Sequence, residues 1–80
     1  MKVEIRLVGS MKRLLPEKDR MSGSSRLDIA PGTTLSGFIE AAGIKGGGAL
    51  VVLVNGRSPE AGRELIEGDV VAVFPPVAGG

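Results

Sequence analysis

The stretch EGDVVAVFPP, residues 67–76, decides the fold of this chain. Residues 69–74 are almost wholly apolar and predict a strand, with Gly68 in the turn that opens it. Pro75 and Pro76 each lack a backbone N–H and fix φ, so the hydrogen-bond ladder has to stop at them. The last strand therefore ends at the prolines, and the chain leaves the sheet there in an extended form.

The tail beyond the prolines, VAGG, tapers to residues without a side chain. Because Gly79 and Gly80 have no Cβ atom, this end of the backbone can enter a channel too narrow for any other residue. At 80 residues the chain has room for one domain and not for a second. We therefore expect a single domain over residues 1–80, from which residues 75–80 protrude as a tail.

Three further apolar runs supply strands to pair with the last one. Charged and apolar residues alternate in residues 2–7, which predicts a half-buried strand. If the alternation continues by one residue, Val8 points outward. Residues 26–29 alternate in the same way and predict a second strand, antiparallel to the first. LVVLV, residues 50–54, is continuously apolar, which favours a central strand covered on both faces, and the Asn-Gly pair after it favours a tight hairpin turn.

Residues 34–43 carry the clearest helical pattern in the chain. Thr34 is a good N-cap, and Gly43 is a natural C-terminal stop. Between them, apolar side chains recur at i, i+3, i+4 and i+7 and form one stripe. The members of this stripe are Leu35, Phe38, Ile39 and Ala42.

A shorter helical turn is expected in SMKRLLP, residues 10–16, with Ser10 as its N-cap. Its apolar residues are expected to face the core, and they are Met11, Leu14 and Leu15. The polar residues 17–25 predict a surface loop between this turn and the second strand.

Two connections are less regular. In RSPEAGRELIEGD, Leu65 and Ile66 are expected to close the bottom of the core, whereas the carboxylates, Asp69 among them, fit a solvated surface. The glycine run at residues 46–48 follows a helix and lacks the Lys-Ser/Thr pair of a phosphate loop, so we expect a plain connection there.

The order of elements is strand, short helix, strand, helix, strand, irregular segment and strand. The predicted fold class is therefore α+β, with one main helix on one face of one sheet. If the first and last strands lie side by side at the centre, the sheet is mixed, and the last strand carries the C-terminus straight out of the body.

Composition argues against several functional classes. The chain has neither Cys nor His, so it lacks the commonest nucleophile, general base and zinc ligands, and self-contained catalysis is not expected. A net charge of +1 gives too weak a field for nucleic-acid binding. No apolar run reaches the length of a membrane span, and the N-terminus lacks a signal-peptide pattern, so we expect a cytoplasmic protein that is monomeric alone.

The C-terminal stretch EGDVVAVFPPVAGG resembles the signature of the ubiquitin-like sulfur-carrier proteins of the MoaD and ThiS type, most closely the small subunit of molybdopterin synthase. PGTTL before the main helix, VNG after the third strand and the GD turn match the same pattern, so the resemblance covers the whole chain. It implies the β-grasp fold, in which one main helix packs on a mixed sheet of four or five strands.

The resemblance also implies a chemical role for the tail. A partner of the ubiquitin-activating type, which binds ATP and Mg²⁺, would join the Gly80 carboxylate to AMP. Sulfur from a donor would then replace AMP and leave a thiocarboxylate. A larger synthase subunit would use that sulfur to make molybdopterin, the ligand of molybdenum or tungsten. The chain itself would be a carrier that binds no cofactor or metal.

The resemblance assigns roles to individual residues as well. Gly80 would react, and the residues before it would position it in the partner's channel; these are Pro75, Pro76, Val77, Ala78 and Gly79. Phe74 matches a family position that packs against partners, although a core role at the end of the strand is an equal alternative. The outward-facing Val8 could join Phe74 in one apolar patch.

Other functions stay open at this point. The same tail would serve a related carrier for thiazole synthesis or tRNA thiolation, or a ubiquitin-like modifier that is attached to protein lysines. A non-covalent β-grasp interaction module, with the Gly-Gly as a frayed end, is an alternative of another class. An autonomous enzyme is the least favoured, because no pattern fixes a pair of its carboxylates.

Overall fold

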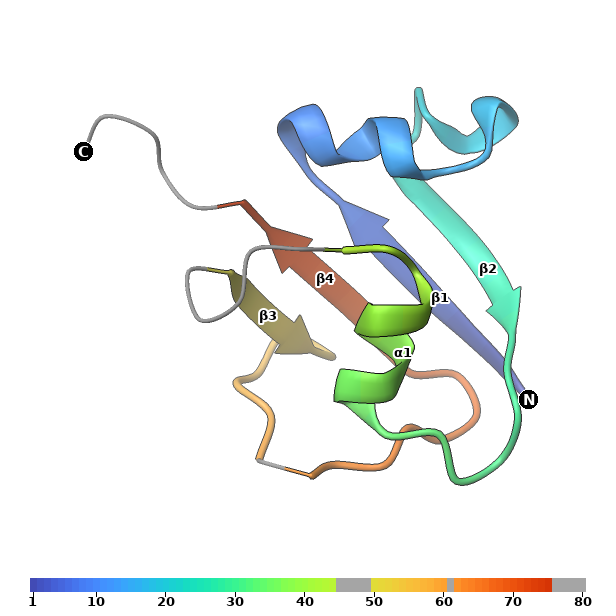
Figure 1. Cartoon of the computed structure of the whole chain (residues 1–80), viewed down its shortest axis with the longest axis vertical. Coiled ribbons are helices and arrows are strands. Elements are labelled where there is room, and N and C mark those ends of the chain that lie inside the picture. The colour runs from blue at the N-terminus through green and yellow to red at the C-terminus, as the bar shows by residue number, and fades with distance from the viewer. Residues whose placement is uncertain (45–49, 61, 76–80) are drawn as a thin grey trace.

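The structure is a computed structural model, and it describes residues 1–44, 50–60 and 62–75. Figure 1 shows one sheet with a helix across one of its faces. The elements are β1 (Lys2–Leu7), the 3₁₀ helices η1 (Gly9–Leu14) and η2 (Glu17–Asp19), β2 (Ser24–Asp28), α1 (Leu35–Ala41), β3 (Val51–Val54) and β4 (Val70–Phe74). In the part of the chain described, no helix has the length and apolar character that crossing a membrane would need.

The four strands form one mixed sheet in the order β2-β1-β4-β3. β1 is parallel to β4, and the pairs β1–β2 and β3–β4 are antiparallel. The prediction of an α+β fold is therefore confirmed, and the condition named for a mixed sheet, that the first and last strands lie side by side, is met. Since β1 and β4 run in the same direction, the C-terminal ends of both strands lie at the same end of the sheet. β4 therefore ends beside the point where β1 passes into η1.

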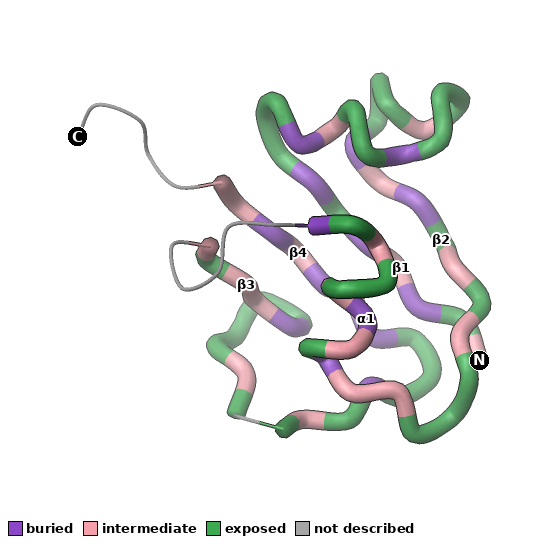
Figure 2. Tube along the Cα trace, viewed as in Figure 1, coloured by how far each residue is buried: buried purple, intermediate pink, exposed green. Residues whose placement is uncertain are grey.

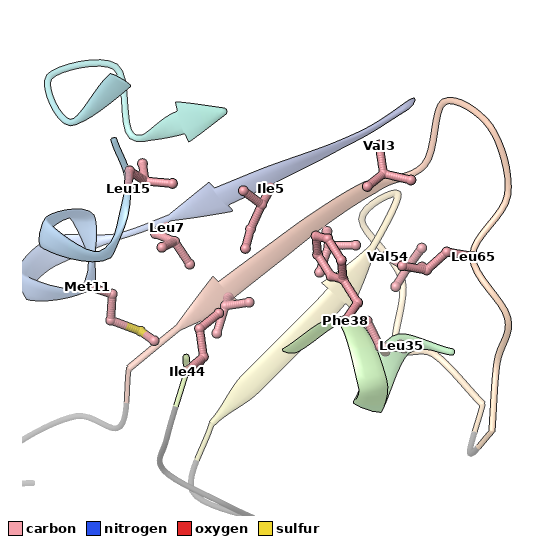
Figure 3. Packing of buried hydrophobic residues seen from close by; sticks show 12 residues of the cluster. Val3, Ile5, Leu7, Met11, Leu15, Leu35, Phe38, Ile44, Val54 and Leu65 are labelled. Carbon is pink, nitrogen blue, oxygen red and sulfur yellow. The ribbon is translucent and has the colours of Figure 1, made fainter. Parts of the chain in front are cut away.

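The core lies between α1 and the sheet (Figure 3). Alternate residues of β1 and β4 supply its floor, so that Ile5 lies opposite Val71 and Leu7 opposite Val73 in the parallel register. These four side chains are at most 3% exposed. Figure 2 shows burial alternating along both strands. The period of two in the sequence predicts this alternation for β1, whereas the sequence of β4 is apolar throughout.

The main helix begins and ends where its sequence predicts. The Thr34 hydroxyl accepts a hydrogen bond from the Gly37 N–H at 3.2 Å and so caps the first turn. Gly43 has φ +77°, and its N–H donates to the Glu40 carbonyl, which closes the last turn. Phe38, in the middle of the apolar stripe, is 3% exposed and belongs to the core.

The short helical turn differs from its prediction in two ways. η1 begins at Gly9, its N-cap is Val8, and Ser10 therefore lies inside the helix. Leu14 is 42% exposed, whereas Leu15 is buried. The helix stops at Leu14 and Leu15 turns to an extended backbone, so only one of the two adjacent leucines can point into the core.

The segment predicted as a polar loop is partly regular structure. Residues 17–19 form η2, and β2 begins at Ser24, two residues before the predicted strand. Ser25 is 5% exposed because it pairs with Ile5 on the face that α1 covers. Leu27, on the same face, packs against the core as predicted.

The prediction of a central, doubly covered strand over residues 50–54 is wrong. β3 lies at the edge of the sheet and pairs only with β4 among the described strands. Val54 faces the core, whereas Val51 is 53% exposed. The continuous apolar run thus reflects one face covered by the chain itself and a second face that the described chain leaves open.

The turns at the other end of β3 and β4 match their predictions. Asn55 and Gly56 both have positive φ, at 53° and 80°, and form a two-residue hairpin turn closed by the Val54 N–H donating to the Arg57 carbonyl. Gly68 has φ +86° in the turn before β4. The glycine run at residues 46–48 lies outside the described residues.

The irregular segment before β4 corrects two further predictions. Leu65 is 2% exposed, but Ile66 is 61% exposed, since neighbouring residues of an extended segment point to opposite sides. Asp69 is buried rather than solvated, at 2% exposed. Its carboxylate accepts hydrogen bonds from the Ile66 N–H, the Asn55 side-chain amide and the Arg63 guanidinium.

These contacts set the protonation state of Asp69. Burial by itself raises the pKa of the Asp69 carboxyl, but hydrogen bonds from the Ile66 N–H and Asn55, with the nearby charge of Arg63, hold that pKa below its ordinary value. The side-chain amide oxygen Oδ1 of Asn55 in turn accepts a hydrogen bond from the Val70 N–H. The ionised carboxylate therefore joins the hairpin turn to the start of β4.

Candidate functional site

The tail leaves the sheet at the end of β4, beside the start of η1. Phe74 is the last residue of β4, and Pro75 follows it outside the strand, half-buried. The ladder therefore stops at Pro75, as the missing proline N–H predicts. The five residues beyond it, among them the predicted reactive residue, lie outside the described residues: Pro76, Val77, Ala78, Gly79 and Gly80.

An apolar surface lies on the open face of the sheet, the face opposite α1, next to this exit point. In the antiparallel register Phe74 lies opposite Val51, and Ala72 lies opposite Leu53. Phe74, Leu53 and Ala72 are half-buried, and Val51 is mostly exposed. Phe74 is therefore not a core residue of this chain: its side chain lies on the open face.

Val8 lies at the border of the same surface. Its backbone is extended, with φ −117° and ψ 147°, so it continues the alternation of β1 and points to the open face. The parallel register pairs Leu7 with Val73, which brings Val8 level with Phe74. Val8 is 41% exposed. We name this surface the open-face patch, and its members are Val8, Val51, Leu53, Ala72 and Phe74.

The other half of the open face is charged. Arg6 donates a hydrogen bond to Glu4, and this bond holds the pKa of the Glu4 carboxyl below its ordinary value. Arg26 is exposed on the neighbouring strand β2, where it lies opposite Glu4 in the antiparallel register. The open face is thus apolar over β3 and β4, near the tail, and polar over β1 and β2. An apolar patch with a charged border is typical of a surface that binds another protein.

The structure brings together the two residues that the sequence singles out on the surface, Val8 and Phe74. It adds Val51 and Leu53, which were missed because the run that contains them was assigned to a strand covered on both faces. The signal that could have found them is the lack of alternation in a short strand, since an edge strand with one solvated face normally alternates.

Comparisons with known proteins agree with this architecture. Residues 8–80 match the family model described as the ThiS family. No curated protein matches the chain.

Several solved structures share the fold. SAMP1 from Haloferax volcanii is 24% identical with a TM-score of 0.72, and the match covers 100% of both chains. A protein from Pyrococcus furiosus assigned as subunit 1 of the molybdopterin converting factor is 25% identical with a TM-score of 0.73, over 96% of this chain and 99% of that one. A complex of subunits 1 and 2 of the molybdopterin-converting factor from Helicobacter pylori matches at 22% identity and a TM-score of 0.61, over 100% of both chains. These likenesses confirm the predicted ubiquitin-like β-grasp fold.

Proposed function

Because the chain belongs to the ThiS family of ubiquitin-like sulfur-carrier proteins, we propose that Gly80 carries sulfur as a C-terminal thiocarboxylate. A carboxylate at neutral pH is a poor electrophile, so an activating enzyme first joins it to AMP with release of pyrophosphate from Mg-ATP. A nucleophilic sulfur of a donor then displaces AMP. Where the donor is a persulfide, a thiol next reduces the S–S bond of the acyl intermediate and releases the thiocarboxylate.

In this scheme the chain is a substrate and carrier, and the groups that perform the chemistry belong to its partners. ATP and Mg²⁺ bind to the activating enzyme. The chain's own residues supply the reactive end, Gly80, the tail that reaches it, and a surface that positions the body. The observation that supports the proposal is that β4 ends in Phe74, on the open-face patch, and continues directly into Pro75. The patch therefore lies next to the point where the tail leaves the body.

We further propose that the sulfur is used for molybdopterin, with this chain as the small subunit of a synthase. The Pyrococcus furiosus protein, at 25% identity over nearly the full length of both chains, supports this assignment. The Helicobacter pylori structure is a complex of subunits 1 and 2, which supports a larger subunit as a partner of this chain. In the proposed scheme that subunit encloses the tail and uses its sulfur. The open-face patch is the surface on which that subunit would dock.

The test is a reconstitution with the cognate activating enzyme, Mg-ATP and a sulfur donor. Intact-mass measurement should show one oxygen replaced by sulfur, and pyrophosphate release should depend on Gly80. A variant that lacks Gly80 is the matched control, because it keeps the whole described domain. Failure of the wild-type chain to release pyrophosphate with any cognate enzyme would contradict the proposal.

A second function is favoured by one observation, the likeness to SAMP1, which a second Haloferax volcanii structure names as small archaeal modifier protein 1. An activated Gly80 can acylate a lysine amine in place of accepting sulfur. Mass spectrometry of cell extracts would then find lysines joined through an amide to peptides that end at Gly80. A carrier that only donates sulfur would leave no such linkage.

A further inference from the structure

The 3₁₀ helix η1 is a basic ridge at the end of the molecule from which the tail leaves. Its last turn holds Lys12 and Arg13, and its first turn holds no acidic residue. Val8 and Leu14 stand at its two ends and are 41% and 42% exposed. The ridge thus combines two cations with two exposed apolar side chains. Of residues 8–15, only Met11 and Leu15 belong to the core that the described residues form.

A groove of about 300 Å³ runs along one side of this ridge, and we name it the tail-root groove. Figure 3 shows Met11 and Ile44 near the end of β4, which is the region where the groove lies. Its walls are Met11, Arg13 and Leu14 of η1, together with Gly43, Leu50 and Pro75. Pro75 is therefore at once the root of the tail and part of the groove wall.

The chemistry of the groove indicates what it can bind. Leu14, Leu50 and Pro75 offer apolar contact, and none of the described residues that line the groove is acidic. Arg13 forms no ion pair or hydrogen bond within residues 1–44, 50–60 and 62–75, so its guanidinium is available to another molecule. A carboxylate beside an apolar side chain would satisfy both features at once.

Resting on the proposed function, we propose that the tail-root groove docks an acidic segment of the activating enzyme, which places one apolar side chain between Leu14 and Pro75 and a carboxylate on Arg13. A protein that encloses the tail as far as its root has to cover Pro75, and so it meets the groove. Activation precedes every use of the sulfur. The contact therefore serves the carrier whichever acceptor follows.

The groove and the open-face patch have different positions around the end of β4. The groove is bounded by η1 and by Gly43, two residues after the end of α1, whereas the patch lies on the face of the sheet opposite α1. A partner that used both would hold the last strand from two sides. Binding at two sides fixes the direction in which the tail enters the enzyme's channel, which raises the rate of reaction at Gly80 rather than its intrinsic reactivity.

The experiment compares Arg13→Glu and Leu14→Ser with matched controls elsewhere on the molecule. Arg57→Glu makes the same charge change on an exposed residue at the far end of β3, and Ile66→Ser removes an apolar side chain that is 61% exposed, against 42% for Leu14. We expect each groove variant to lower kcat/KM for pyrophosphate release by about tenfold or more, and each control to change it by less than about twofold. The loss in Arg13→Glu should shrink as salt rises.

Three results would contradict the groove proposal and leave the proposed carrier function unaffected. Groove variants that react within about twofold of the wild type, while deletion of Gly80 stops the reaction, would show that the groove is not used. A faster reaction of Arg13→Glu would indicate that the groove holds the chain's own tail. Equal losses in Arg57→Glu would indicate a general effect of charge. Thermal unfolding confirms that each variant is folded, and Arg13→Gln replaces Arg13→Glu if that variant is not. A wild-type chain that supports no pyrophosphate release would instead contradict both the proposed carrier function and the groove proposal.

Discussion

Phe74 lies opposite Val51 across the β3–β4 pair, on the face of the sheet that α1 leaves uncovered. The last residue before the tail and an edge-strand valine that is 53% exposed therefore belong to one apolar surface. This relationship accounts for a run of valines and leucine in a strand that has only one covered face. It also places this apolar surface directly beside the point where the tail leaves β4.

Truncation of Phe74 should separate binding from folding. Because Phe74 is half-buried on the open face, Phe74→Ala should cost only about 1–2 kcal/mol of unfolding free energy, while weakening the complex with the larger subunit by about tenfold or more. Urea unfolding and isothermal titration calorimetry measure the two effects. A loss above about 4 kcal/mol would instead assign Phe74 to the core.

Val51→Ser tests the residue that the sequence pattern missed. Its side chain is mostly exposed, so stability should change by less than about 0.5 kcal/mol, whereas binding of the larger subunit should weaken several-fold. Met21→Ser is the matched control, since Met21 is 94% exposed and lies between η2 and β2, away from the patch. If both variants bind like the wild type, Val51 is not part of the interface.

Deletion of Gly80 separates the carrier from a non-covalent interaction module. The shortened chain should unfold with the same free energy as the full chain, because the described core lies within residues 3–73. It should still bind the larger subunit through the open-face patch, yet it should release no pyrophosphate with the activating enzyme and support no molybdopterin synthesis. Full activity of the shortened chain in cells would favour the interaction module.

Local patterns were sufficient where a residue's surroundings depend on its near neighbours. The alternation of Val3, Ile5 and Leu7 and the Thr34 cap are decided by period and by hydrogen bonds within one turn, and both agree with the structure. The fold class followed from these elements and from the order in which they occur.

The sequence predictions were wrong where contacts between residues far apart in the chain determine burial or strand order. A buried Asp69 depends on Asn55, 14 residues away, and on Arg63, and nothing in its own stretch distinguishes it from the solvated carboxylates beside it. The edge position of β3 depends on strand order, because an apolar run looks the same whether its second face is covered by the same chain or left open. For the tail the sequence remains the only source, since residues 76–80 lie outside the described structure.

Asp69 should make stability depend on pH. Its pKa in the folded state lies below its value in the unfolded chain, so the ionised carboxylate stabilises the fold at pH values above the unfolded pKa of about 4, and this contribution is lost as pH falls through the lower, folded value. Asp69→Asn should therefore cost about 1–3 kcal/mol at neutral pH. The difference between variant and wild type should shrink below about pH 4. Urea unfolding across this range would contradict the assignment if the difference stayed constant.

Gly23 and Gly32 form a matched pair that tests the packing at the end of β1, where the open-face patch begins. Both have positive φ, at 73° and 87°, so an alanine at either position should cost about 1–2 kcal/mol of backbone strain. A Cβ atom at Gly23 would lie 2.9 Å from the Leu7 carbonyl oxygen, which is too close, whereas a Cβ atom at Gly32 would meet nothing within 4 Å. Gly23 also accepts the Leu7 N–H through its carbonyl, at 2.8 Å, so the backbone cannot shift without loss of that bond. Gly23→Ala should thus be less stable than Gly32→Ala by about 1–3 kcal/mol in urea unfolding, and equal losses would show that the contact with Leu7 relaxes freely.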